Sequence, residues 1–204
     1  MQKIISLTTK PGTDGTGSEF PPPLRKFAAS PVCPSLPIVC YINLSMHIRA
    51  ATPADIPTVL SLLRELAAYE RKLDAVRIDE SLLAEHAFGE HKCIEMRLAH
   101  LDGKAVAYAI FFPHFASYCG RPWLYLEDLY VQPAARGHRV GRGMMAHLAA
   151  VTIERHWAGM AWGVLDWNEP AFAFYRALGA VTANGHVSMD LSGDALHQLA
   201  KESN

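Results

Sequence analysis

A glycine-containing turn between an apolar strand and a helix is the feature that most restricts how this chain can fold. The run from Trp123 to Val131 predicts a strand, and the segment from Gly141 to His156 predicts a helix. Small residues between them can bring backbone N–H groups close to a ligand, and the dipole of the following helix favours an anion. Three arginines add positive charge to this turn: Arg136, Arg139 and Arg142. The pattern predicts a phosphate-binding turn or, alternatively, a solvated basic turn, and it lacks the residues typical of ATP or NAD sites.

Length and composition limit the class of protein. The 204 residues are half hydrophobic, which suits one compact domain, and no apolar stretch reaches the roughly 18 residues of a membrane span. The net charge of −1 provides no attraction to nucleic acid or to an anionic membrane. The four cysteines lack paired spacing, which favours reduced thiols in a cytoplasmic protein. We expect no metal, because the histidines are scattered and only His91 and Cys93 form a close pair.

The first 45 residues differ from the rest of the chain. A polar Gly/Ser tract at 10–18 is followed by Pro21, Pro22 and Pro23, a composition that resists packing. We therefore expect residues 1–45 to be a disordered extension, or to be translated from an upstream start that the cell does not use. The domain is expected to cover 46–204.

Alternating strand and helix patterns follow from Met46 onward, which is typical of an α/β domain. A helix start is marked by Thr52 as N-cap, Pro53 at the first helical position and an acid two residues later. Strands are expected at 47–51, 94–100, 105–112, 123–131, 161–166 and 186–191. Helices are expected at 52–67, 79–88, 141–156 and 169–178.

Two adjacent acids, Glu127 and Asp128, interrupt the apolar strand at 123–131. Strand side chains alternate between faces, so we expect Glu127 to share an apolar face away from Asp128. The other residues of that face would be Trp123, Tyr125, Leu129 and Val131. Burial there would raise the pKa of Glu127 and suit it to act as a general base, although a salt bridge to an arginine is the alternative.

The segment 164–180 is the most distinctive in composition. Asn168 can cap a helix that contains Pro170 near its start and ends at Gly179. Within this helix, Tyr175 falls on the apolar stripe, and periodicity alone predicts a core tyrosine.

These motifs resemble those of the GNAT superfamily. The run from Arg136 to Gly141 resembles its pyrophosphate-binding turn Q/R-x-x-G-x-G/A, but Arg139 stands at the first glycine. The resemblance holds there provided that residue 139 does not need a left-handed backbone. Leu-Glu-Asp-Leu-Tyr-Val at 126–131 and Asp-Trp-Asn-Glu-Pro at 166–170 resemble diamine (spermidine/spermine-type) and thialysine acetyltransferases, and the likeness extends over 48–191.

The resemblance implies an α/β GNAT fold with a mixed, bent central sheet flanked by helices. It further implies a homodimeric N-acetyltransferase that uses acetyl-CoA and a small primary amine, with direct attack in a ternary complex. Glu127 would be the base and Tyr175 the acid. The positions expected to bind the cofactor are Leu129, Tyr130, Val131, Arg136, Gly137, His138, Arg139, Val140, Gly141, Arg142, Asn168, Glu169, Pro170 and Ala171. The positions expected to border the amine are Tyr69, Glu70, Asp128, Ala161, Trp162 and Gly163.

Two departures from the polyamine enzymes bear on the substrate. The loop at 115–122 contains neither acid nor tryptophan, and Asn-Gly-His at 184–186 replaces an acid followed by Gly-Trp. A long polycation needs several acids along its path, so a short diamine or lysine-like amine is favoured over spermine. The alternatives are a protein N-terminal or lysine acetyltransferase and a non-catalytic acyl-CoA sensor.

Overall fold

A single mixed sheet forms the centre of the domain in the computed structural model, which describes residues 45–183 and 188–203. The strands are β1 Met46–Ala50, β2 Glu95–Leu101, β3 Lys104–Ala116, β4 Arg121–Val131 and β5 Met160–Trp162. They lie in the order β1-β2-β3-β4-β5; the first three pairings are antiparallel, and β4 pairs with β5 in parallel. The predictions for residues 1–44 lie outside the described residues.

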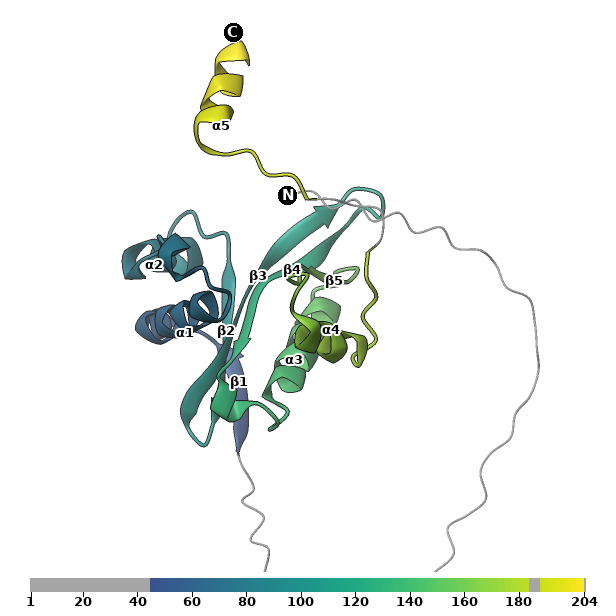
Figure 1. Cartoon of the computed structure of the whole chain (residues 1–204). Coiled ribbons are helices and arrows are strands. Elements are labelled where there is room, and N and C mark those ends of the chain that lie inside the picture. The colour runs from purple at the N-terminus through teal and green to yellow at the C-terminus, as the bar shows by residue number, and fades with distance from the viewer. Residues whose placement is uncertain (1–44, 184–187, 204) are drawn as a thin grey trace, which may run out of the picture. The chain divides into compact units, whose positions relative to one another are not determined.

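Helices cover both faces of the sheet (Figure 1). The α-helices of the described residues are α1 Ile56–Tyr69, α2 Glu80–Phe88, α3 Val140–Glu154, α4 Glu169–Arg176 and α5 Gly193–Ala200. Helices α1 and α2 lie on one face and α3 and α4 on the other (Figure 1). Local sequence determines where two of these helices begin. The Asp79 carboxylate accepts the N–H of Leu82 at the start of α2, and the Asn168 side chain accepts the N–H of Ala171 at the start of α4. No helix in the described part of the chain is long and apolar enough to cross a membrane.

Two hydrophobic clusters hold these layers together. On the α1 and α2 face, Val59, Leu83 and Tyr108 are fully buried. On the α3 face, Phe111 and Leu148 are fully buried. Alternate residues of β3 therefore enter opposite cores, which explains why the strand reads as an almost continuous apolar run.

A β-bulge interrupts the pairing of β3 with β4. Leu126 lies opposite Phe111, whereas Asp128 lies opposite the next residue, Ile110, so Glu127 is the extra residue. The extra residue reverses the alternation of β4. Before the bulge the even-numbered Leu124 and Leu126 face α3, and after it the odd-numbered Leu129 and Val131 do so. The prediction that Glu127 shares one face of the strand with Trp123, Tyr125, Leu129 and Val131 is therefore wrong. It assumed that side chains alternate regularly along the whole strand, and the bulge interrupts that alternation.

Most predicted elements are confirmed, and the differences lie towards the C-terminus. Strand β5 ends at Trp162 instead of 166, because β4 no longer runs beside it there. The last predicted strand is wrong over 188–191, where no strand forms, and its residues 186 and 187 lie outside the described part. Helix α5 follows at Gly193–Ala200 and was not predicted.

Candidate active site

A cavity of about 460 Å³ lies where β4 and β5 separate. The two strands pair only from Leu124 to Leu126, against Met160 to Trp162. Past these pairs, the edge of β4 faces the cavity instead of another strand. Predicted site residues that line it are Tyr69, Glu70, Glu127, Asp128, Leu129, Tyr130, Val131, Arg136, Gly137, Arg139, Val140, Gly141, Arg142, Trp162, Gly163, Asn168, Pro170, Ala171 and Tyr175.

Three predicted residues do not line the cavity, and several unpredicted ones do. His138, Glu169 and Ala161 are outside its wall. The unpredicted lining residues are Leu66, Leu126, Ala135, Val164, Leu165 and Phe174. All six are apolar, so no chemical signal in the sequence separated them from ordinary core residues.

The start of α3 presents free backbone donors to this cavity. The N–H of Gly143 makes the first bond of the helix, to the carbonyl of Arg139 at 2.9 Å. The N–H groups of Val140, Gly141 and Arg142 precede it and have no backbone acceptor among the described residues. Together with the helix dipole they form an arrangement suited to an anion.

Arg139 precedes α3 with a left-handed backbone, φ 62° and ψ 11°. The condition that residue 139 avoid this region is therefore not met. The turn nevertheless forms, with Gly137 also at positive φ (84°). A side chain in this region costs about 1–2 kcal/mol, which the rest of the domain offsets.

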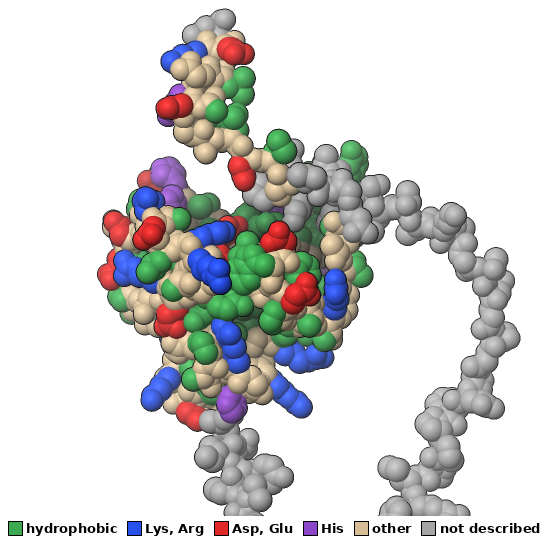
Figure 2. All heavy atoms as spheres, in the orientation of Figure 1, with side chains coloured by type: hydrophobic (Ala, Val, Ile, Leu, Met, Phe, Trp, Pro, Cys, Tyr) green, Lys and Arg blue, Asp and Glu red, His purple; other side chains and the backbone are tan. Residues whose placement is uncertain are grey.

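Basic side chains surround this turn. Arg136, Arg139 and Arg142 are all exposed. Figure 2 shows several Lys and Arg side chains on the lower part of the face in view, where Figure 1 places the loop that enters α3. Arg136 is held in place, because its Nε donates to the carbonyl of Val131 at 3.1 Å and its guanidinium lies 5.3 Å from the Tyr69 ring centroid.

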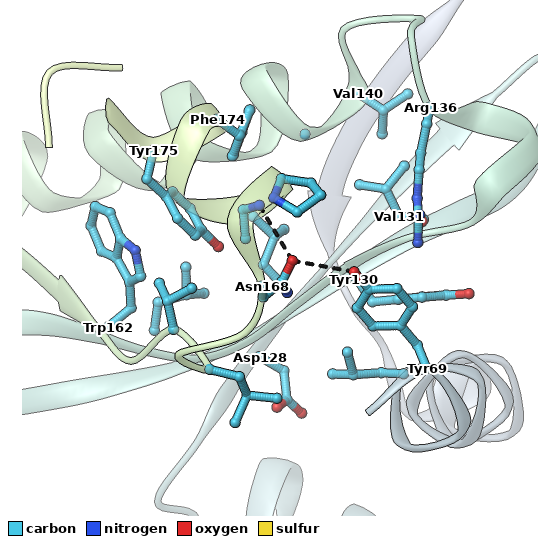
Figure 3. A pocket seen from close by; sticks show the side chains of 18 of the residues that line it. Tyr69, Asp128, Tyr130, Val131, Arg136, Val140, Trp162, Asn168, Phe174 and Tyr175 are labelled. Atoms are coloured by element: carbon cyan, nitrogen blue, oxygen red, sulfur yellow. Dashed lines mark hydrogen bonds between the residues drawn. The ribbon is translucent and has the colours of Figure 1, made fainter. Parts of the chain in front are cut away.

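Asn168 joins the two sides of the cavity. Its Oδ1 accepts the N–H of Ala171 at 3.3 Å, which caps α4, and the hydroxyl of Tyr69 at 3.2 Å, which comes from the end of α1 (Figure 3). The Tyr69 ring also packs 5.8 Å from that of Trp167. The N-terminus of α4 is thus tied to α1 across the cavity.

Three carboxylates line the same cavity: Glu70, Glu127 and Asp128. Asp128 is partly buried and accepts a hydrogen bond from the Tyr108 hydroxyl at 3.0 Å. Burial, followed by the charges of Glu127 and Glu70, raises the pKa of Asp128 to about 6, against the lowering effect of Tyr108. Glu127 is exposed on the bulge, so its predicted burial is wrong. Asp128 has the environment that was expected for Glu127.

Tyr175 lies on the opposite side of the cavity from Tyr69 (Figure 3). Its ring is 4.9 Å from Trp162 and 5.1 Å from Phe174, centroid to centroid. Burial raises the pKa of Tyr175 to about 12. The hydroxyl therefore keeps its proton at neutral pH, as a general acid must.

The described residues contain no group of three His, Cys, Asp or Glu side chains placed to hold a metal ion. Cys93, which is close to His91 in the sequence, lies 3.8 Å (Sγ to Nδ1) from His86 in an exposed pair.

Comparison with known proteins identifies the class of this fold and site. The model of the acetyltransferase (GNAT) family matches residues 59–180, and the chain belongs to this family of acetyltransferases. The thialysine N-epsilon-acetyltransferase of Bos taurus is 34% identical over 164 residues, which are 75% of this chain and 96% of the bovine protein. Spermidine/spermine N(1)-acetyltransferase-like protein 1 of Homo sapiens is 32% identical over 142 residues, 66% of this chain and 20% of that protein.

The solved structure of an integron cassette protein from V. cholerae superposes with a TM-score of 0.66 at 25% identity, covering 77% of this chain and 98% of that one. The predicted GNAT fold and N-acetyltransferase class are confirmed by these matches.

Proposed function

We propose that this GNAT enzyme transfers the acetyl group of acetyl-CoA to the primary amine of a short diamine or a lysine-like molecule. The observation that carries the proposal is the composition of the cavity. Its wall contains free amides and arginines suited to a pyrophosphate, and three carboxylates suited to a cation. Such a cavity can hold an anionic co-substrate and a cationic substrate together, which suits direct transfer in a ternary complex.

The residues of the chain fit the cofactor in two places. The amides of Val140, Gly141 and Arg142, with the nearby arginines, would bind the pyrophosphate. The unpaired edge of β4 past Leu126 would hydrogen-bond the pantetheine arm as a sheet edge accepts a strand. When bound, acetyl-CoA supplies the thioester that is attacked.

Proton transfer would be divided between Glu127 and Tyr175. An alkyl ammonium has a pKa near 10.4, so only about one molecule in a thousand is a free amine at pH 7. Glu127, exposed on the bulge, would take the ammonium proton, directly or through a water molecule. The nitrogen then forms a bond to the acetyl carbon and the C–S bond breaks. Tyr175 would give its proton to the sulfur, and the second proton of the nitrogen would leave to solvent, from which Tyr175 is reprotonated.

The relatives support the choice of substrate. Their names specify thialysine and spermidine or spermine, all of which carry a primary amine on a flexible chain. Because the described loop at 115–122 contributes no acid, we favour the shorter, lysine-like amines. By the same likeness we expect a cytoplasmic homodimer, which light scattering and cell fractionation would test.

Acetylation of a panel of amines, followed by release of free CoA, tests the proposal. We expect thialysine, lysine and short diamines to give higher kcat/KM than spermine. Binding of acetyl-CoA without turnover of any amine would instead favour a sensor. Turnover of peptides alone would favour a protein acetyltransferase.

A further inference from the structure

Tyr108 of β3 carries a buried hydroxyl that the proposed reaction does not use. Its side chain is 0% exposed and belongs to the core between the sheet and α1. The hydroxyl donates to Oδ2 of Asp128 at 3.0 Å. A phenylalanine would fill nearly the same space without burying a polar group, so the contribution of this hydroxyl must lie in that hydrogen bond.

Asp128 needs such a donor because its surroundings oppose its charge. The groups that face it are Tyr108 from β3, Glu127 from β4 and Glu70 at the end of α1. None of the ion pairs among the described residues includes Asp128. Its Oδ1 accepts no hydrogen bond from any other described residue, and Asp128 lines the cavity (Figure 3).

We propose that Tyr108 is a positioning residue of the amine site. Its hydroxyl holds the Asp128 carboxylate by one oxygen and leaves the other oxygen to bind the ammonium group of the substrate. This inference rests on the proposed function. A neutral donor stabilises the carboxylate form, and burial raises the pKa of Tyr108 itself, so the donor keeps its proton over the whole working range.

The test compares Tyr108→Phe with the wild-type enzyme at pH values from 5 to 9. Loss of the donor should raise the pKa of Asp128 by about one unit, so kcat/KM for the amine should fall about tenfold near pH 5 and recover near pH 9. The effect should lie in KM for the amine, with the Kd for acetyl-CoA unchanged. Tyr108→4-aminophenylalanine restores a donor of the same size and should recover most of the loss.

Thr152→Val is the matched control. Thr152 of α3 is 5% exposed, and its hydroxyl donates to the carbonyl of Leu148 at 2.8 Å, away from the cavity. The Thr152→Val variant should lose about as much stability as Tyr108→Phe, while its kcat/KM should depend on pH as that of the wild type does.

The outcomes separate the two proposals. A wild-type protein that acetylates no amine would overturn the proposed function, and this inference with it. If the wild type is active, the role of Tyr108 alone would be overturned by either of two results. The loss of kcat/KM in Tyr108→Phe could be equal at every pH, or its pH profile could match that of Thr152→Val. If Tyr108→Phe does not fold, ¹³C NMR titration of Asp128 in the wild type decides. A midpoint above about 7 would overturn the proposal, because the carboxylate would then be largely uncharged at neutral pH.

Discussion

Leu126 of β4 and Trp162 of β5 form the last pair between the two parallel strands. The next residue of β4, Glu127, is the extra residue of the bulge, and the next residue after β5, Gly163, already lines the cavity. One irregularity in the sheet thus opens the site and presents two carboxylates to it.

Arg136→Glu should weaken acetyl-CoA binding while leaving the fold intact. The substitution places negative charge beside the expected pyrophosphate and removes the bond to the Val131 carbonyl. We expect KM for acetyl-CoA to rise at least tenfold at low ionic strength, and the effect to shrink as salt is added. Lys104→Glu, the same charge change at an exposed position outside the cavity, is the control. Equal cofactor affinity in the two variants would refute the assignment of the turn.

Replacement of Arg139 separates backbone strain from charge. Arg139→Gly and Arg139→Ala lose the same charge, but only glycine is relaxed at φ 62°. The glycine variant should therefore be more stable to urea than the alanine variant by about 1 kcal/mol, while both bind acetyl-CoA equally weakly. If alanine proved as stable as glycine, the left-handed conformation at residue 139 would not hold in solution.

The sequence predicted those parts of the site that depend on local chemistry. The cap at Asn168 is set by neighbouring residues and forms as expected. The turn before α3 also forms, but with a left-handed Arg139, which the prediction from the sequence had taken as a condition against it. Tyr175 lines the cavity, and its role as the acid stays a prediction.

The bulge at Glu127 could not be predicted because no residue of β4 marks it. It depends on how β4 pairs with Phe111 and Ile110 of β3, which is a tertiary relationship. For the same reason the sequence assigned the buried environment to Glu127 instead of Asp128. The early end of β5 is also a tertiary effect, because β5 ends where β4 no longer pairs with it.

Asp128→Asn should stabilise the domain at neutral pH. The folded protein raises the pKa of Asp128 from 3.8 to about 6, so the carboxyl favours folding when protonated, and this contribution is lost as pH rises from about 4 through about 6. An asparagine stays neutral throughout. The variant should therefore exceed the wild type by about 2–3 kcal/mol in unfolding free energy at pH 7–8, and the difference should disappear near pH 4. Urea unfolding at each pH measures this, and a variant less stable than the wild type at pH 8 would contradict it.

Glu127→Gln and Tyr175→Phe should differ in how pH affects them. The glutamine keeps the size of Glu127 but cannot take the ammonium proton, so kcat should fall by about 10² to 10⁴ at pH 7. The loss should shrink as pH approaches the pKa of the amine, near 10.4, because free amine is then abundant.

Tyr175→Phe should lose less activity, since protonation of the departing thiolate is the easier step, and high pH should not restore the lost activity. Pre-steady-state rates from pH 6 to 10, with acetyl-CoA affinity as the control, distinguish the two. Full activity of Glu127→Gln at neutral pH would transfer the role of base to another group, and Asp128, with its pKa of about 6, would be the first to test.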